Sequence, residues 1–592
     1  MDSFFAKTVK ASVYYTSKYW ITIFALFPLI FVVYTPSIDN PFHYDDLHSI
    51  RDNPHLRSVE NIPQFFYRTD FFSADPRGRM YRPLVLVSYA FNYGLDKLQV
   101  ESYHWVNMGV HALNSVLVIA VGRLFLSGLW TPFVAGLIFA LHPINSEVVN
   151  YISSRSESLC ALFFLTSFLS YAYARRAERW SVPLMVTSLL AFVGALLCKS
   201  VAVTLVPLLF FCEWRFFSPV SSPRTVVKRL TPFFLLALVY VVGMRQMLHA
   251  ALLGAPVRDE WTQWATQIKA LAYYAKLLVF PWPLNVEHPF TLGSAGIVVG
   301  LALLLVISSV VALWCGGPIA RVAGTWFLLV LAPTFFVPLN VLVNEHRLYI
   351  PSAMFAIGLA ALIQRGCGAK RVWALIPLLV LYAGLDMRRT AQWGTPETLW
   401  GASLKESYYM PRPHIYMGDA LRNAGRNREA LGHYKKALEV YPDVLSGGDR
   451  LSIYNNMGAV YLAMESWDES VISYENALQI DPDYTLAKAG LEGAKAMRSE
   501  GGKANAIKWQ KQGLIALVEG RVDEAIGLLN RSVRLYPLSQ THSALAQAHG
   551  RLGDLEGMRA AYQSIINLDP KSAAAERARD RLRALPEIVD QK

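Results

Sequence analysis

The sequence predicts an all-α protein in two parts: a polytopic bundle of about eleven membrane-spanning helices, then a soluble α-solenoid of short helical repeats. Hydrophobic residues make up 53% of the 592 residues and charged residues only 17%, whereas a typical soluble protein carries about a quarter charged residues. Long apolar runs fill the chain up to about residue 386. Beyond that point no run approaches the ~18 apolar residues that a span needs.

The apolar runs predict the spans in order. They cover residues 19–36, 104–126, 131–142, 157–174, 181–198, 201–214, 231–249, 293–315, 322–340, 350–364 and 372–386. Residues 264–283 are ambiguous, because they carry Lys269 and Lys276 and end in Pro281-Trp282-Pro283. This composition suits an interfacial or re-entrant helix better than a full crossing.

The charges of the loops predict the orientation. With the first lysines in the cytoplasm, eleven crossings put the basic loops on the cytoplasmic side, as the positive-inside rule requires. These loops contain Arg123, Arg175-Arg176, Arg215 to Arg229, Arg321 and Arg365 to Arg371. The net charge of +12 follows from this pattern, so nucleic acid is not an expected partner. The five cysteines lie in or beside apolar segments and form no CxxC pair, which argues against a zinc site.

One spacing recurs in the soluble part. Four residues at offsets 0, 12, 16 and 24 fit two helices that cross at a small residue, with an aromatic between them and a proline closing the second. The copies are Gly418, Ala430, Tyr434, Pro442; Gly458, Ser470, Tyr474, Pro482; Gly513, Ala525, Leu529, Pro537; and Ala546, Met558, Tyr562, Pro570. They are similar to the tetratricopeptide repeat, with insertions expected at 442–451 and 482–512.

These patterns predict a membrane domain at residues 1–390 with a first outer loop at 37–103, a linker at 391–412 and a repeat domain at 413–592. Such arrays offer a concave surface for peptides or proteins, so we expect an acceptor protein or peptide as a partner. The alternative is a structural extension that docks on the membrane domain.

Asp45 and Asp46 follow the first span in the first outer loop. Adjacent carboxylates are hard to ionise together, so one of them could keep a raised pKa and act as a catalytic base. For an isolated pair, a helix N-cap or a solvated turn would be the better interpretation. Which carboxylate takes the proton stays open, as does a divalent cation bound at this loop.

The pair is not isolated, because further polar residues gather on the same predicted face. Ionisable groups at membrane depth are costly and usually functional. A cationic set among them could hold a phosphate, and we assign Arg82, Arg155, Lys199, His346 and Arg347 to that role. The other predicted pocket residues are His43, His104, Asn107, His111, His142, Glu147, Glu157, His288, Glu345 and Tyr349.

No Walker loop, GxGxxG, HExxH or GxSxG motif stands in a convincing context, so nucleotide-driven pumping and standard hydrolase chemistry lose support. Several segments instead run in a specific order: HYDDLHSIRDNPHLRS, MYRPLVLVSYAFNYGL, HWVNMGVHALNSVLV, FALHPINSEVVNYISSRSESL, LLCKSVAVTLVPLLFF, FPWPLNVEH and NEHRLYIPS. Followed by tetratricopeptide repeats, they resemble the transmembrane and tetratricopeptide-repeat O-mannosyltransferase family and its bacterial relatives, which have the C-type glycosyltransferase fold.

The resemblance implies a membrane glycosyltransferase whose donor is a polyprenyl-phosphate-linked monosaccharide and whose acceptor is a serine or threonine hydroxyl of an extracytoplasmic protein. In C-type enzymes an acidic residue of the first outer loop is the base, and Asp45 and Asp46 occupy the matching positions. We favour inversion by a single displacement. Lys199 is followed by Ser200, where eukaryotic members often carry an acidic residue and bacterial relatives often proline, which leaves the donor and acceptor open.

The chain has no KDEL-like ending, and we expect a bacterial inner-membrane protein with its repeats in the periplasm, or an endoplasmic-reticulum protein with lumenal repeats if eukaryotic. Two alternatives to protein glycosylation stay open: transfer to a glycan or lipid, and a non-catalytic membrane scaffold or transporter. A transporter would show paired broken helices or polar residues near mid-membrane, and neither is clear in the sequence.

Overall fold

The computed structural model describes residues 26–75, 78–176, 181–217, 222–245, 259–292, isolated positions between 296 and 308, 317–337, 341–367, 374–570 and 572–585. Within these residues the regular elements are all helices, which confirms the predicted all-α class. The chain divides into two compact units, residues 1–424 with 435–446 and residues 425–434 with 447–592. The predicted linker, 391–412, is itself helical and contains α18 (Pro396–Glu406), which belongs to the first unit.

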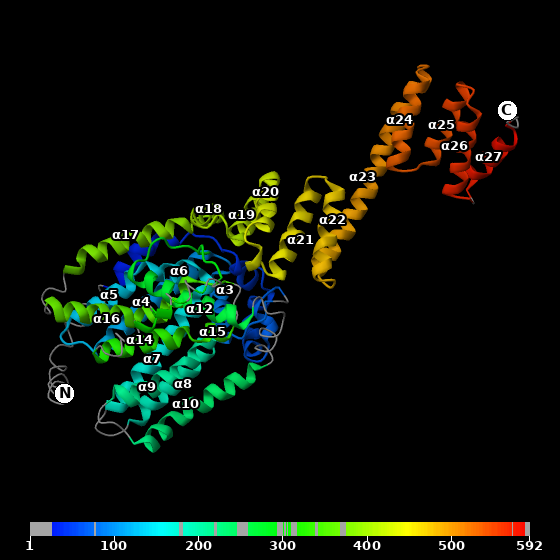
Figure 1. Cartoon of the computed structure of the whole chain (residues 1–592). Coiled ribbons are helices and arrows are strands. Elements are labelled where there is room, and N and C mark those ends of the chain that lie inside the picture. Colours follow the sequence, from blue (N-terminus) through cyan, green and yellow to red (C-terminus); the bar gives the residue numbers. More distant parts are fainter. Residues whose placement is uncertain are drawn as a thin grey trace. The chain divides into compact units, whose positions relative to one another are not determined.

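The first unit is a helix bundle. In Figure 1 its central helices lie alongside one another, and α4 packs on α5 and α7 while α16 packs on α5 and α14. Their bounds are α4 Val100–Gly122, α5 Trp130–Leu141, α7 Arg155–Arg176, α14 Pro318–Leu331 and α16 Tyr349–Cys367. A second group covers α7 and contains α8 Val182–Leu196, α9 Leu205–Arg215 and α10 Pro223–Gly243. The core between them is apolar and tightly filled, for example by the buried Trp326 against Phe164 and Phe168.

Five described helices are long and apolar enough to cross a membrane: Val100–Gly122, Ile152–Arg176, Pro223–Gly243, Pro318–Phe336 and Glu345–Arg365. The pair Trp130–Leu141 and Pro143–Asn150, bent by 52°, makes up to six. Residues 26–37 and α8 form shorter apolar helices, while most of the predicted span 293–315 lies outside the described residues. The ambiguous stretch becomes α12 (Glu260–Val279), which is not among the candidates. The total of eleven spans therefore stays a prediction.

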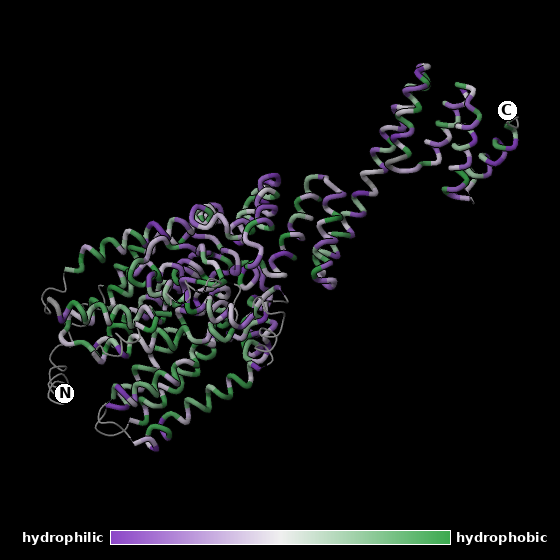
Figure 2. Tube along the Cα trace, viewed as in Figure 1, coloured by the Kyte–Doolittle hydropathy of each residue, from purple (hydrophilic) through white to green (hydrophobic). Residues whose placement is uncertain are grey.

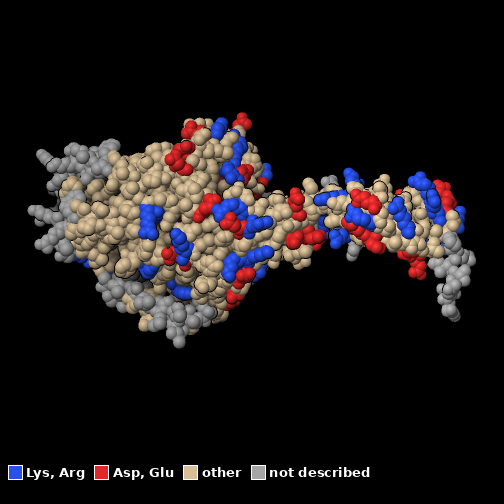
Figure 3. Space-filling view, turned by 90° about the horizontal axis from the view of Figure 1, so that it is seen from above, with Lys and Arg blue, Asp and Glu red and all other residues tan. Residues whose placement is uncertain are grey.

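The outward faces of the bundle are apolar. On α10, Val227, Phe234, Val239 and Val242 are each more than half exposed, and Figure 2 draws this helix largely in the hydrophobic colour. In Figure 3 charged side chains are sparse over much of this unit. Water would penalise such a surface, so these faces fit contact with lipid and the protein is a membrane protein.

The predicted first outer loop is a compact layer of short helices. They are η2 Thr35–Ser37, η3 Leu47–Arg51, η4 Pro54–Arg57, η5 Val59–Phe66, η6 Thr69–Phe72 and then α3 Pro83–Asp96. Asn53 fixes one turn, since its side chain donates to the carbonyls of Phe71 and Phe72 and its oxygen accepts from the His55 amide. This layer holds the Asp45-Asp46 segment in place.

The remaining helices are antiparallel pairs joined by short turns, as the recurring spacing predicts. They are α21 Gly447–Ala463 with α22 Trp467–Ile480, α23 Thr485–Val518 with α24 Val522–Leu535, and α25 Ser539–Arg551 with α26 Leu555–Leu568, followed by α27 Ala573–Arg583. The helices α19 Pro411–Asn423 and α20 Asn427–Glu439 precede them in the chain. A Cβ on Gly458 would lie 2.9 Å from the ring of Tyr474, so the small residue permits the helix crossing. The expected insertion at 482–512 extends α23 rather than forming a loop.

Candidate active site

The two adjacent carboxylates of the first outer loop have different environments. Asp46 is fully buried, and both of its oxygens are used. Oδ1 accepts from the Ser153 amide at 2.7 Å and the Ser153 hydroxyl at 2.5 Å, and Oδ2 accepts from the His43 amide at 3.0 Å. Although Asp46 stands at the N-cap position of η3, its side chain caps no helix. It ties the loop to the start of α7.

Asp45 is the accessible member of the pair, with a side chain 54% exposed. Its Oδ1 lies 3.4 Å from Nε2 of His48, whose Nδ1 lies 2.9 Å from the Ser73 hydroxyl. Burial of the loop raises the pKa of Asp45, but the hydrogen bond and charge of His48, with the charge of Arg412, outweigh it and hold the pKa below its usual value. Asp45 is therefore ionised at neutral pH and open to a ligand.

The pKa of Asp46 moves the other way. Burial raises it to about 7, against the three hydrogen bonds from His43 and Ser153, and the negative charge of Asp45 adds to the rise. Two neighbouring carboxylates whose environments push their pKa values apart are typical of an acid–base site.

A cationic cluster lies at the start of α7, the helix that follows Ser153 in the chain. Arg82 donates from Nη1 to the Ser156 hydroxyl at 3.1 Å, and Lys199 forms an ion pair with Glu157. Nε2 of His346 lies 3.6 Å from Oε1 of Glu157. Within the part of the chain that the structure describes, no carboxylate pairs with Arg82. Arg82 is therefore the cation most available to an anionic ligand.

A single turn of the chain, Ser153–Glu157, contacts both Asp46 and the cationic cluster. Ser153 binds Asp46, Ser156 accepts from Arg82, and Glu157 holds Lys199. Three helical residues advance the chain by only ~5 Å. The buried Asp46 and the cationic cluster are thus bound to neighbouring residues of one short segment.

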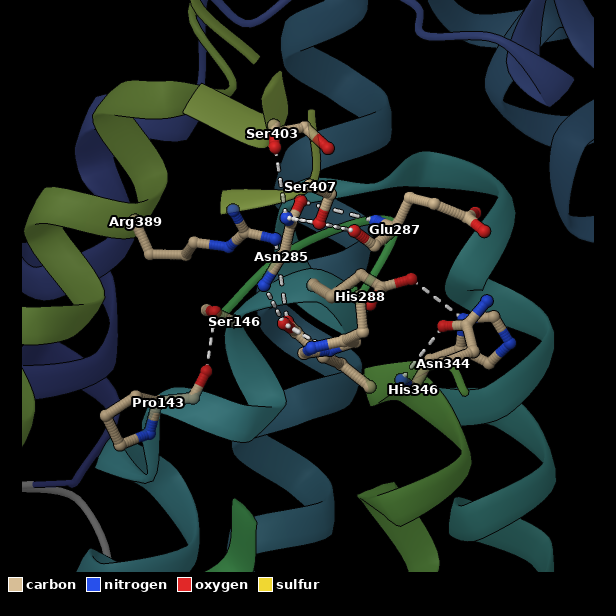
Figure 4. Close-up of polar contacts among 12 residues, drawn as sticks. Pro143, Ser146, Asn285, Glu287, His288, Asn344, His346, Arg389, Ser403 and Ser407 are labelled. Carbon is tan, nitrogen blue, oxygen red and sulfur yellow. Dashed lines mark hydrogen bonds and ion pairs between the residues drawn. The ribbon is translucent and has the colours of Figure 1, made fainter. Parts of the chain in front are cut away.

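Behind this turn is a buried charged network (Figure 4). Oε1 of Glu345 lies 3.2 Å from Nε2 of His288 and accepts from the Asn285 amide, while its Oε2 lies 3.6 Å from Nη2 of Arg389. Asn285 also donates to the Ser407 hydroxyl at 2.8 Å. The network fixes the segment that carries His346.

Glu147 links this network to the cationic cluster, because its Oε1 lies 2.8 Å from Nδ1 of His346. The predicted pocket residues Glu147, Glu157, Lys199, Arg82 and His346 are therefore brought together. Glu345 and His288 lie one layer further in.

Other predicted residues are engaged elsewhere by the protein itself. Arg155 is fully buried and its guanidinium donates to Asn107 at 2.7 Å, Asn92 at 2.5 Å and the Tyr103 carbonyl at 2.9 Å. Arg347 donates to the carbonyls of Val341 and Leu342 and to the Tyr274 hydroxyl. The structure brings neither guanidinium to the cationic cluster.

The remaining predicted histidines bind backbone carbonyls. His43 contacts the carbonyl of Trp393, His104 that of Asn40, His111 that of Ala140 and His142 that of Leu278, all within 3.1 Å. Tyr349 contacts His111 at 2.8 Å. Burial lowers the pKa of His43 to about 4, which suits a neutral structural histidine. His43 and His104 thus hold the loop, whereas His111, His142 and Tyr349 join helices of the bundle, and none of these contacts brings the five side chains to the cationic cluster.

Sequence reasoning missed three partners. His48 stands three residues after Asp45 on one helical turn, a spacing that could have identified it. Ser153 and Ser156 stand at the same spacing on the other side of the site, but a serine beside an apolar run is too common a feature to single out.

A divalent cation at the Asp45-Asp46 loop, left open by the sequence, would have few protein ligands there. Both oxygens of Asp46 already accept from protein donors. Among the residues described, no group of three or more His, Cys, Asp or Glu side chains is arranged to hold a metal ion. This donor set does not fit a dedicated metal centre.

The fold and the site define a polytopic membrane protein with a carboxylate pair in the loop after its first apolar helix, a cationic cluster at the start of α7 and helical repeats at the end of the chain. Models of the tetratricopeptide repeat match residues 409–483 and 544–572. The chain is 25% identical over 590 residues to human "Protein O-mannosyl-transferase TMTC3", 26% identical to its mouse counterpart and 25% identical over 494 residues to human "Protein O-mannosyl-transferase TMTC1". The relatives thus confirm the predicted family resemblance.

The alignment with each TMTC3 protein covers 90% of this chain and 62% of the relative, so the chain spans less than two thirds of their length. Among solved structures, "Crystal structure of YrrB: a TPR protein with an unusual peptide-binding site" matches 31% of this chain and 97% of that one at 18% identity. Its TM-score of 0.15 is too low to carry an argument.

Proposed function

We propose that this protein is a membrane glycosyltransferase that moves a mannosyl group from a polyprenyl-phosphate donor to serine or threonine hydroxyls of an extracytoplasmic protein. One observation carries the proposal: Asp46, the chain neighbour of the exposed Asp45, and the cations Arg82 and Lys199 all contact a single turn of the chain, Ser153–Glu157. The names of the relatives, protein O-mannosyl-transferases, supply the reaction class and the sugar.

Asp45 is the proposed base. Its carboxylate accepts the proton of the acceptor hydroxyl while the hydroxyl oxygen forms a bond to the anomeric carbon of the sugar. The bond between that carbon and the phosphate oxygen breaks in the same step, and the polyprenyl phosphate leaves with its electron pair. Attack opposite to the leaving group inverts the anomeric configuration.

Arg82 and Lys199 are proposed to bind the phosphate. The leaving group gains negative charge as the bond breaks, and fixed cations that face this charge lower the barrier. Lys199 is partly neutralised by Glu157, so Arg82 contributes the larger share. The guanidinium fork also matches a phosphate in geometry.

Stacked aromatic residues hold the backbone next to Asp45, the proposed base. The ring of Tyr44, next to Asp45 in the chain, stacks on Tyr151 with centroids 4.5 Å apart, and Trp400 stacks on Tyr416 at 4.6 Å. Tyr44 contacts Tyr416 as well, at 5.5 Å. A packed support of this kind keeps a catalytic group in one position.

The repeats are proposed to bind the acceptor polypeptide, in line with the concave surfaces of such arrays. The predicted topology puts the repeats and the Asp45 loop on the same, extracytoplasmic side of the membrane. A bacterial inner membrane with the repeats in the periplasm is the proposed location.

The test is the isosteric variant Asp45→Asn, with Asp52→Asn as the matched control. Asp52 lies in the same loop and pairs with the exposed Arg51. Asp45→Asn should insert and unfold like the wild type but lose transfer, by 10²-fold or more for a missing general base. Mass spectrometry of envelope proteins and glycolipids from cells carrying each variant gives the readout.

If Asp45→Asn retains full glycosylation, the proposed base is wrong. A loss of sugar from glycolipids with unchanged proteins would favour the glycan- or lipid-directed alternative. Neither pool should change in Asp52→Asn cells.

A further inference from the structure

A polar cavity that is lined by no residue of the Asp45 loop lies in the first unit. It has a volume of about 120 Å³, several times the ~15 Å³ that a single water needs. Residues from the segment after α12, from the end of α17 (Ile376–Gln392) and from α18 surround it. The lining includes Trp282, Leu385, Arg388, Arg389, Gln392 and Lys405.

The cavity is cationic. Three of its lining residues are basic and one, Glu406, is acidic. Arg388 lies over the ring of Trp282, 4.8 Å from its centroid, and within the described ranges neither Arg388 nor Lys405 pairs with a carboxylate. Their charge is available to an anion.

Arg389 supplies an independent indication of a ligand. It is only 4% exposed, and its Nε and Nη2 have no hydrogen-bond partner among the residues described. Nη1 donates to Oε1 of Gln392 at 2.8 Å, and Nη2 forms an ion pair with Glu345 at 3.6 Å that is longer than a hydrogen bond. Buried N–H groups are rarely left unpaired, so a group with acceptor oxygens in this cavity would satisfy them.

An apolar surface leads to the cavity along α17. Leu381, Leu385, Arg388 and Gln392 stand at i, i+4, i+7 and i+11, which puts them on one stripe of the helix. Leu381 is 56% exposed and the predicted eleventh span ends at residue 386. The stripe thus runs from the apolar span to the cationic cavity, and Trp282 stands at its polar end, where tryptophan is enriched at membrane interfaces.

We infer that this cavity binds the phosphate group of an anionic phospholipid, with the acyl chains lying along the Leu381 side of α17. Arg388 and Lys405 attract the charge, Arg389 donates to the phosphate oxygens, and the exposed leucine contacts the chains. The predicted topology puts Arg388 and Arg389 on the outer side of the membrane, where the positive-inside rule disfavours basic residues. A bound anion would neutralise their charge. The inference does not depend on the proposed transfer reaction.

The test measures lipid binding to the purified full-length protein in neutral detergent by native mass spectrometry and thermal shift. The ligands are dioleoyl phosphatidylglycerol, dioleoyl phosphatidylcholine and inorganic phosphate. The variant is R388Q/K405Q, and R68Q/K97Q is the matched control, because it removes two exposed cations that do not line the cavity.

Phosphatidylglycerol should bind the wild type and raise its unfolding temperature, and R388Q/K405Q should weaken binding about tenfold or more. The control and Asp45→Asn should bind like the wild type, so the result is independent of catalysis. Equal binding by both double variants, or equal binding of phosphatidylcholine, would overturn the inference. If inorganic phosphate stabilises the protein as well as the lipid does, the source is free phosphate and the lipid assignment is wrong.

Discussion

The substitution Arg155→Lys tests whether this arginine stabilises the packing of the bundle or binds the phosphate of the lipid-linked sugar donor. Its guanidinium is fully buried and donates to Asn107, Asn92 and the Tyr103 carbonyl, and it lies over the ring of Tyr89, 4.8 Å from its centroid. Nη1 also donates to the Ser88 hydroxyl at 3.2 Å, and a lysine ammonium on a thinner stem cannot reach four acceptors that diverge around a planar fork. At least one or two acceptors would remain buried without a donor.

Each buried acceptor left unpaired costs about 1–3 kcal/mol, so Arg155→Lys should lower the free energy of unfolding by about 2–5 kcal/mol. For a large domain this corresponds to a drop in unfolding temperature of about 5–10 °C. The assay is thermal unfolding in detergent, followed by loss of the monodisperse peak in size-exclusion chromatography, with transfer measured at a temperature where the variant remains folded.

Arg82→Lys is the matched comparison, since this half-buried arginine has a single hydrogen bond to Ser156. It should unfold within about 1 kcal/mol of the wild type and lose transfer instead. If Arg155→Lys unfolded normally and lost only donor affinity, the structural role given to Arg155 would be refuted and the phosphate-binding role predicted from the sequence would stand.

Four further outcomes are expected. Arg82→Gln should raise KM for the lipid-linked donor and lower kcat/KM by 10-fold or more in a steady-state transfer assay, whereas Arg68→Gln, in the same loop, should leave both unchanged. Because burial raises the pKa of Asp46 from 3.8 to about 7, the protonated carboxyl stabilises the folded state at low pH, and this contribution is lost as the pH rises from about 4 to about 7. The unfolding temperature of the wild type should therefore fall more steeply than that of Asp46→Asn between about pH 4 and about pH 7, and parallel curves in that range would contradict this. Glu345→Gln removes the carboxylate from a buried ion pair and should cost about 3–5 kcal/mol, seen as a lower yield of monodisperse protein. Gly458→Val should separate α21 from α22, because the added side chain collides with the ring of Tyr474. Limited proteolysis should then cut within residues 447–480, while transfer to a soluble hydroxyl acceptor continues.

Local patterns predicted the fold because helices are local structures. The spacing of Gly458, Ser470 and Tyr474 is a consequence of two adjacent helices crossing, and the structure has those helices together with a 2.8 Å hydrogen bond from the Ser470 hydroxyl to the Gly458 carbonyl. The extension of α23 through 482–512 was not predictable in the same way. That stretch lacks a strong apolar period, and its helix is completed by packing against its neighbours.

The partners in the candidate site could not be read from the sequence, because they are remote from each other along the chain. Asp46 and Ser153 are 107 residues apart, and His346 and Glu147 are 199 residues apart. Arg155 begins α7 and Arg82 directly precedes α3, so the position of each arginine at a helix start does not distinguish their roles. Only the tertiary packing gives Arg155 four hydrogen-bond acceptors and Arg82 one.

The separation of roles between the adjacent carboxylates follows from hydrogen-bond capacity. A general base must reach the hydroxyl it deprotonates, and Asp46 has both oxygens committed to His43 and Ser153 in a fully buried position. Its contribution is to hold the loop on the turn that also carries Ser156 and Glu157. Asp45, pointing into the open beside His48, is left to meet the substrate. The buried acid thus fixes the distance between the exposed acid and the cations, and transfer should depend on both carboxylates for different reasons.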